Sequence, residues 1–207
     1  MTKTAQFWDR AAEKYAKSPI RDEQTYNEKL GVTRGYLDEE SRVFEFGCGT
    51  GTTAIHHAPY VASIVATDIS LKMIEIARGK AAAERIENID FRCETLEECT
   101  EPDESFDAVM AHNILHLLED PAAAIASSFR LLKPGGVFVT STACIGDALP
   151  HWRILLFLAK LIGKAPFVNV LKRATLETYF RDAGFVVELE WHRSKLSAFI
   201  ILKKPVS

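Results

Sequence analysis

The stretch VFEFGCGTGTT, residues 43–53, joins an apolar run carrying one acid, Glu45, to three alternating glycines, Gly47, Gly49 and Gly51. Because glycine adopts positive φ and lets other groups approach the backbone, such glycines at the end of a predicted strand indicate a ligand-binding loop. The spacing is G-x-G-x-G, one residue shorter than the G-x-G-x-x-G/A pattern of dinucleotide sites. A turn that binds nothing is the alternative, but glycines without a ligand would only weaken the strand end.

Asp68 ends the next apolar run, SIVATD, 17 residues after Gly51. A carboxylate at this position could accept both hydroxyls of a ribose, because it offers two acceptor oxygens. Its alternative role is to cap the helix that begins near Leu71, a role that suits Ser70 better. The glycine loop and Asp68 together predict a ligand that contains a nucleoside.

Histidines at positions 112 and 116 follow a later apolar run with the i, i+4 spacing of a helix, where a substrate should lie. An imidazole exchanges its proton near neutral pH, so His112 is the better candidate for a catalytic base and His116 for a framework residue. Asn113 could instead hydrogen-bond the ligand or the substrate, and these alternatives remain open. His56 and His57 are adjacent and lack metal-ligand spacing, so no metal site is expected.

Hydrophobic periodicity predicts an α/β fold. Two polar helical segments within 1–39 precede short apolar runs at 43–46, 64–67, 89–92, 106–111 and 137–142, with helical segments at 71–85 and 121–132 between them. This alternation indicates βαβ units and a mostly parallel sheet covered on both faces. A helix at 175–183 and two runs at 186–191 and 198–202 then predict an antiparallel hairpin. We therefore expect a Rossmann-like three-layer sandwich with a mostly parallel seven-stranded sheet.

A chain of 207 residues suffices for one substantial core, so we expect a single domain over 1–207. Its expected parts are N-terminal cover helices in 1–39, a cofactor-binding core in 40–146, a helical lid insertion in 147–173, and a helix and hairpin in 174–207.

Composition excludes several classes of function. A net charge of −3 and a pI near 6.1 give no bias toward nucleic acid. Four cysteines without a CxxC pair, and no secretory signal, indicate a reduced, cytoplasmic chain. The longest mostly apolar stretch, 154–162, is far shorter than the roughly 20 residues that span a bilayer. A small-molecule substrate is the expected partner, whereas the oligomeric state is left open.

Four blocks of sequence resemble the class I S-adenosylmethionine-dependent methyltransferases, specifically the methyltransferase type 11 group. The blocks are VFEFGCGTG (43–51), VATDIS (65–70), FDAVMAHNILHLLED (106–120) and LLKPGGVFVTS (131–141), and LETYFRDAGF (176–185) fits as well. Each block alone is a weak signal, but four in order and register are strong. The resemblance implies S-adenosylmethionine as cofactor and methyl transfer as activity.

The resemblance also implies roles for individual residues. The glycine loop would lie beside the methionine moiety, with Glu45 orienting the loop or the ligand's amino group. Asp68 would hold the ribose hydroxyls, Ile69 would pack on the adenine, and Asn113 could bond the methionine carbonyl. The N-terminal FWDRAAEKY is similar to the cover helix of the family, which would place Tyr15 over the methionine end.

Two positions depart from the family pattern. The segment FRCETLEE carries Glu94 and Thr95 where relatives usually have a Gly-Asp pair that reaches the adenine amino group. The adenine contact is therefore assigned to Glu94, Thr95 and Leu96. Glu45 replaces the more common aspartate and gives a longer reach for the same charge.

The sequence leaves three classes of function open. The leading hypothesis is C- or O-methylation of a small, hydrophobic molecule. The sequence AHNILH stands where an Asn/Asp-Pro-Pro-Tyr motif would be expected in enzymes that methylate nucleic-acid bases, which argues against such bases as methyl acceptors. An NAD-binding oxidoreductase is the second, disfavoured by the glycine spacing. The third, a non-catalytic nucleoside-binding or membrane-surface protein, rests on the apolar, basic segment 147–173. This segment is expected to form a lid with possible peripheral membrane contact, or else a core helix with solvated lysines.

Overall fold

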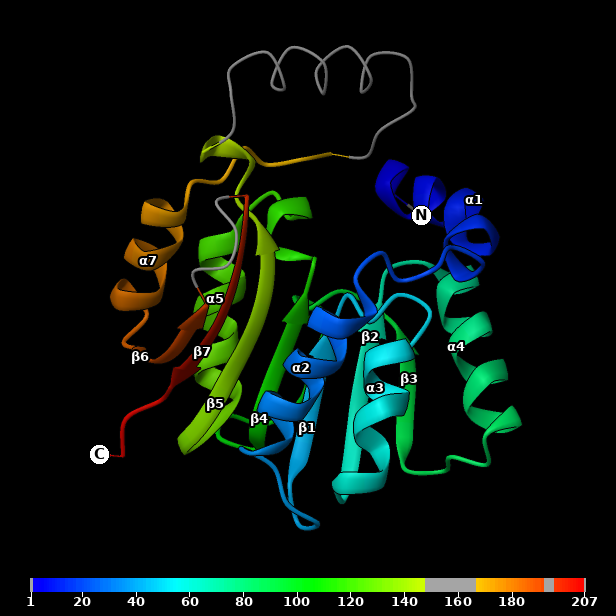
Figure 1. The fold of residues 1–207 in the computed structure, drawn as a ribbon, viewed down its shortest axis with the longest axis horizontal. Coiled ribbons are helices and arrows are strands. Elements are labelled where there is room, and N and C mark those ends of the chain that lie inside the picture. The colour runs from blue at the N-terminus through cyan, green and yellow to red at the C-terminus, as the bar shows by residue number, and fades with distance from the viewer. Residues whose placement is uncertain (1, 148–166, 192–195, 207) are drawn as a thin grey trace. The chain divides into compact units, whose positions relative to one another are not determined.

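The protein is described by a computed structural model that covers residues 2–147, 167–191 and 196–206 (Figure 1). Its strands form one seven-stranded sheet in the order β3-β2-β1-β4-β5-β7-β6. The strands are β1 (Arg42–Phe46), β2 (Ser63–Asp68), β3 (Ile89–Cys93), β4 (Phe106–His112), β5 (Leu132–Ala143), β6 (Val186–Trp191) and β7 (Ser197–Lys203). The predicted Rossmann-like α/β fold is confirmed.

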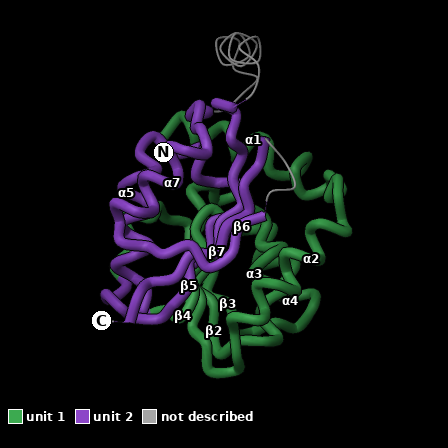
Figure 2. Tube along the Cα trace, turned by 60° about the vertical axis from the view of Figure 1, so that its left-hand side comes forward, with its two compact units in different colours: residues 1–100, 106–108 green, residues 101–105, 109–207 purple. Residues whose placement is uncertain are grey.

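The chain divides into two compact units, which Figure 2 distinguishes by colour. The first comprises residues 1–100 and 106–108, and the second comprises residues 101–105 and 109–207. Strand β4 contributes residues to both. Each unit is described separately below.

In the first unit, parallel strands carry the core. β1 pairs with β2 and β2 with β3, so that Phe46 lies opposite Thr67 and Asp68 opposite Cys93. Four of the five residues of β1 are buried, as expected for a strand covered on both faces. The parallel register brings the carboxyl ends of all three strands to one edge of the sheet, where ligands bind in this architecture.

Side-chain caps begin three helices of the first unit, α1, α2 and α4. The helical elements of this unit are α1 (Lys3–Ala16), α2 (Glu23–Arg34), the short α3 (Thr52–His57) with the 3-10 turn η1 (Ala58–Tyr60), and α4 (Leu71–Ala83). Thr2, Asp22 and Ser70 each accept a hydrogen bond from a backbone N–H in the first turn of α1, α2 and α4. The expected capping role of Ser70 is thereby confirmed.

The second unit contains the antiparallel end of the sheet. Besides β5, β6 and β7 it holds α5 (Pro121–Leu131), α7 (Arg173–Asp182) and the 3-10 turns η2 (Leu115–Leu117) and η3 (Ile145–Asp147). β7 runs antiparallel to both β5 and β6, which confirms the predicted hairpin. It lies between β5 and β6, so that β6 rather than the last strand forms the edge.

Most of the segment predicted as a lid lies outside the described residues, which resume at residue 167. The proposals made for 151–173, an apolar roof and a membrane contact, are therefore not tested. Within the described ranges, no helix has the length and apolar character that crossing a bilayer requires.

Candidate functional site

The glycine loop connects β1 to α3 at the carboxyl edge of the first unit's sheet. Gly47, Gly49 and Gly51 have φ of 64°, 55° and 73°, the left-handed region that side chains other than glycine rarely adopt. The N–H of Cys48 donates to the carbonyl of Thr67 at 2.9 Å and so ties the loop to the end of β2. The alternation of glycines is thus a requirement of the backbone path.

Two of these glycines have different surroundings. A Cβ on Gly51 would lie 2.8 Å from the Cβ of Ala77 and 2.8 Å from Cε1 of Phe91, so Gly51 allows the loop to pack on α4 and β3. A Cβ on Gly49 would meet nothing closer than Cε1 of Tyr15, at 3.7 Å. Gly49 therefore faces the open side of the loop, and Gly51 serves packing.

Glu45 lies beneath the loop on β1 and is 2% exposed. Its Oε2 is buried and has no hydrogen-bond partner in the described part of the chain. Burial first, and the charge of Asp68 second, raise the pKa of Glu45 from 4.5 to about 8. A buried carboxyl with an unsatisfied oxygen is costly for a fold to keep, and a cationic ligand would relieve the cost.

Asp68 joins the end of β2 to the glycine loop. Its Oδ2 accepts from the N–H of Gly49 at 2.9 Å, and its Oδ1 accepts from the N–H of Ser70 at 2.9 Å. Burial raises the pKa of Asp68, while these two backbone N–H groups act to lower it. Each carboxylate oxygen retains acceptor capacity, so holding the loop does not prevent Asp68 from binding hydroxyl groups.

Lys80 is a site residue that the sequence analysis missed. From α4 its Nζ donates to the carbonyl of Thr50 at 3.0 Å and to Oγ1 of Thr52 at 2.6 Å. These two residues flank Gly51, so one side chain holds both sides of the left-handed turn. Partial burial lowers the pKa of Lys80. No sequence motif indicates this contact, because the partners lie about 30 positions apart.

Asp9 is a second residue that sequence reasoning missed. Its Oδ1 accepts from Oγ of Ser70 at 2.7 Å and from the N–H of Lys72 at 3.2 Å, which joins α1 to the first turn of α4. The same helix carries Tyr15, which is half exposed beside Gly49. The pKa of Tyr15 is raised first by its partial burial and then by the charges of Asp68 and Glu45. Helix α1 is therefore fixed to the elements that form the site.

The loop after β3 uses its polar groups locally. Thr95 and Glu98 hydrogen-bond each other's backbone N–H groups, at 2.8 and 3.2 Å, and Glu94 lies 3.7 Å from the guanidinium of Arg92. Leu96 is buried. Ile69 lies between Asp68 and Ser70 and is half-buried. Adenine contacts from these residues stay a prediction, as do the other ligand contacts assigned from the sequence.

The histidine pair belongs to the second unit and corrects one expectation. His112 is the last residue of β4, and His116 lies in the three-residue turn η2, so the predicted helical i, i+4 arrangement is wrong. The cause is Asn113, which has a φ of 56° and donates its N–H to the carbonyl of Ser141 at 2.6 Å. This turn ends the strand before a helix can form. Burial lowers the pKa of His116, and Asn113 is exposed.

The arrangement in the first unit suits a ligand with cationic and hydroxyl groups. Glu45 and Asp68 place two carboxyl groups at the base of the loop, and an ammonium group of a ligand would favour the ionised form of Glu45. S-adenosylmethionine carries an ammonium group, a sulfonium group and a ribose with two hydroxyls. The predicted contacts of Glu45 with its amino group and of Asp68 with its ribose stay predictions, and the unpartnered Oε2 of Glu45 is consistent with the first.

Comparison with known proteins agrees with this chemistry. Residues 44–140 match the family described as "Methyltransferase domain". The uncharacterized methyltransferase YcgJ of Bacillus subtilis (strain 168) is 32% identical over 123 residues, which make up 58% of this chain and 49% of YcgJ. A ubiquinone biosynthesis O-methyltransferase of Alkalilimnicola ehrlichii is 36% identical over 154 residues, 72% of this chain and 62% of that protein. The matched part of the chain thus spans 49% and 62% of the length of these two curated relatives.

Solved structures share the fold. The crystal structure of YcgJ has a TM-score of 0.73 at 20% identity and covers 87% of this chain and 99% of its own. The cyclase SpnF has a TM-score of 0.74 at 19% identity, covering 92% and 86%. At these identities the structures show a shared fold, and the sequence match over residues 44–140 is what indicates the class, the S-adenosylmethionine-dependent methyltransferases. Within that class, residues 44–140 belong to the methyltransferase type 11 family, as the four sequence blocks indicate.

Proposed function

We propose that the chain transfers a methyl group from S-adenosylmethionine to a small, hydrophobic molecule, at carbon or oxygen. The observation that carries the proposal is Glu45, whose buried Oε2 has no partner within the described residues and lies below a loop of left-handed glycines. An acid in this state suits the ammonium group of the cofactor. The pyrophosphate of NAD is anionic and would offer this carboxyl no cationic partner.

The candidate site residues of the first unit each have a defined part in this proposal. Glu45 accepts from the amino group, Gly49 allows close approach of the ligand, and Asp68 holds the ribose while it keeps the loop in place. The sulfonium of S-adenosylmethionine supplies an activated methyl group, so the protein's main contributions are to position the acceptor and exclude water. Tyr15 covers the open side of Gly49.

The acceptor class rests on relatives and on local chemistry. A relative named as a ubiquinone biosynthesis O-methyltransferase favours a hydrophobic acceptor with an acidic proton. His112, at the end of β4, would take that proton, as an imidazole can near neutral pH. In that role, His112→Ala should lower kcat and leave cofactor affinity unchanged. Full turnover by this variant would assign His112 to the framework.

Calorimetric titration with S-adenosylmethionine, S-adenosylhomocysteine and NAD tests the cofactor. Asp68→Ala should weaken S-adenosylmethionine binding by about 1–3 kcal/mol, the scale of hydrogen bonds to a charged group. Asp90→Ala is the matched control, because Asp90 lies toward the opposite end of the sheet from Asp68 and pairs with Arg92. Binding of NAD alone, or equal affinity in both variants, would contradict the proposal. The cyclase SpnF shares the fold, so methyl transfer to an acceptor must be assayed as well.

A further inference from the structure

Glu45, the acid assigned above to the amino group of the cofactor, is closed off from solvent. Its side chain is 2% exposed and its Oε2 is buried. A ligand can reach this carboxyl only if a neighbouring group moves. Burial first, and then the charges of Asp68 and Glu45, raise the pKa of Tyr15, so its phenol lies close to both acids. A Cβ on Gly49 would lie 3.7 Å from the same ring. The group to move is therefore Tyr15, which belongs to helix α1.

Helix α1 buries little apolar surface. Of its fourteen residues two are buried, Ala5 and Ala12, and the larger Phe7 and Trp8 are half-buried. Helix α4, in contrast, buries four residues, among them Met73. Local opening costs less free energy where fewer apolar side chains are removed from water. Helix α1 therefore opens more readily than the helix on which it packs.

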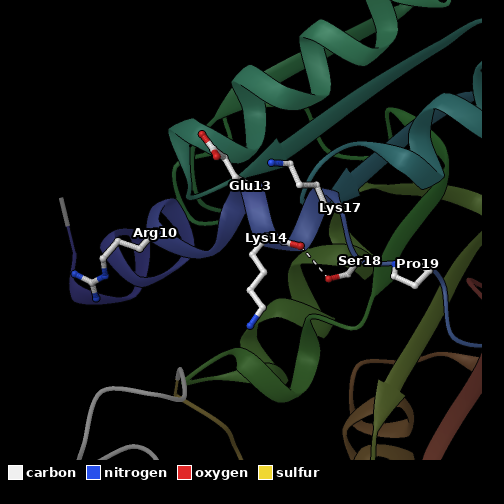
Figure 3. A pocket seen from close by; sticks show the side chains of 6 residues that line it. All are labelled: Arg10, Glu13, Lys14, Lys17, Ser18 and Pro19. Atoms are coloured by element: carbon white, nitrogen blue, oxygen red, sulfur yellow. Dashed lines mark hydrogen bonds between the residues drawn. The ribbon is translucent and has the colours of Figure 1, made fainter.

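The connection from α1 to α2 lies on the surface. Residues 13–24 are all exposed, and residues 17–22 belong to no helix or strand. The end of α1 closes on itself, because Oγ of Ser18 donates to the carbonyl of Lys14 at 2.9 Å and its N–H donates to that of Tyr15 at 3.0 Å (Figure 3). A short exposed connection of this kind can absorb the change in backbone angles when a helix moves as one body.

One carboxylate fixes the middle of α1. Oδ1 of Asp9 accepts from Oγ of Ser70 at 2.7 Å and from the N–H of Lys72 at 3.2 Å. Ser70 is fully buried, and its N–H donates to Oδ1 of Asp68 at 2.9 Å. Asp9 is thereby joined, through a single residue, to the carboxyl assigned to the ribose. We call the two hydrogen bonds of Asp9 the α1 anchor.

We propose that Asp9 is a positioning residue for cofactor exchange: the α1 anchor holds Tyr15 over the glycine loop, and its release lets α1 open so that S-adenosylmethionine enters and S-adenosylhomocysteine leaves. This inference rests on the proposed function, because it assigns a route to the same cofactor site. Asp9 acts on the ligand through α1 and Ser70, without touching it.

The α1 anchor closes the empty protein and the occupied protein alike, so its loss should raise the open fraction of both. The rates of association and dissociation should then rise by the same factor, about tenfold for hydrogen bonds to a charged group, and affinity should stay the same. A residue that only shaped the closed site would raise the dissociation rate alone and weaken affinity.

The test measures the binding of S-adenosylhomocysteine to Asp9→Ala by stopped flow. Tryptophan fluorescence supplies the signal, since the ring of Trp8 lies 6.4 Å from that of Tyr15. Dissociation is measured by a chase with excess S-adenosylmethionine. Glu13→Ala is the matched control, because it removes one acid from an exposed position of the same helix (Figure 3). Both rates should rise about tenfold in Asp9→Ala and stay unchanged in Glu13→Ala.

Hydrogen exchange read by mass spectrometry follows α1 without any ligand. Its amides should exchange about tenfold faster in Asp9→Ala than in Glu13→Ala or the unaltered protein. S-adenosylhomocysteine should slow this exchange in the unaltered protein, because the bound ligand favours the closed helix.

Three results would overturn the inference. The first is binding rates in Asp9→Ala equal to those in Glu13→Ala. The second is faster dissociation with unchanged association, which would make Asp9 a residue that shapes the closed site. The third is faster exchange of the α1 amides with unchanged binding rates, which would separate the opening of α1 from cofactor exchange. An unaltered protein that binds no S-adenosylhomocysteine would instead contradict the proposed function. Thermal unfolding confirms that each variant is folded.

Discussion

Replacing Glu45 by glutamine should change how stability depends on pH. Glu45 titrates at pH about 8 in the folded protein, against 4.5 as its ordinary value. Below pH 4.5 both folded and unfolded states carry the proton, and the contribution of this group is fully present. Between pH 4.5 and 8 only the unfolded state releases it, so the stability of the protein falls as the pH rises.

The size of the effect follows from the same values. The interval from 4.5 to about 8 covers 3.5 pH units, and at about 1.4 kcal/mol per unit the whole loss is about 5 kcal/mol. Above pH 8 both states are ionised and this contribution is constant. Glu45→Gln has no carboxyl to titrate, so its free energy of unfolding should lack this slope. Asp68 is present in both proteins, so the difference between them isolates Glu45.

Urea denaturation at pH 5.5, 7 and 8.5, without cofactor, measures the difference directly. The unaltered protein should lose several kcal/mol relative to Glu45→Gln across this range, with the same denaturant dependence in both. Glu75→Gln, on the exposed surface of α4, is the control and should follow the unaltered protein. Parallel pH profiles for Glu45→Gln and the unaltered protein would show that Glu45 is ionised when folded, and would refute the reasoning.

Binding of S-adenosylmethionine should also depend on the proton that Glu45 carries. An ammonium group beside Glu45 favours its ionised form, so S-adenosylmethionine binding at pH 7 should release up to one proton from this residue. Calorimetry in two buffers of different ionisation enthalpy counts the protons released. The count should fall by the contribution of Glu45 in Glu45→Gln, and an unchanged count would place the amino group elsewhere.

Two further substitutions test how the glycine loop is held. Gly51→Ala should lower the free energy of unfolding by about 2–4 kcal/mol, because the residue has φ 73° and its Cβ would lie 2.8 Å from Ala77. Gly79→Ala, in open space on α4, should be neutral or stabilising, and equal effects in a urea titration would contradict the packing argument. Lys80→Met should cost about 1–3 kcal/mol and weaken the cofactor, through loss of two hydrogen bonds to the loop. Lys72→Met, an exposed change on the same helix, is its control, and cofactor affinity equal in both variants would remove Lys80 from the site.

The sequence predicted the sheet well because its strands are buried runs bounded by turns. The run at 43–46 became β1, which is Arg42–Phe46, and the run at 186–191 matched β6 at both ends. The glycine loop was also predictable, since glycines with positive φ leave a direct mark on the sequence. Sequence patterns therefore predict a structure well where residues close together in the sequence determine it.

Contacts between distant residues left no such mark. Asp9 meets Ser70 across 61 positions, and no periodicity distinguishes it from other acids on a helix surface. The helical spacing of His112 and His116 misled for a related reason. The hydrogen bond from Asn113 to Ser141, 28 positions away, turns the chain before a helix can start. Tertiary contacts decided these cases over local preference.

The fit of Gly51 against Ala77 and Phe91 determines how this protein can be recombined with its relatives. A chimera in which only the glycine loop came from a relative would pack that loop against a helix and a strand whose side chains fit the loop of this protein. Lys80 adds the same restriction, since its partners are the backbone of Thr50 and the hydroxyl of Thr52. The smallest segment that can be exchanged without mismatch therefore runs from β1 through β3, residues 42–93.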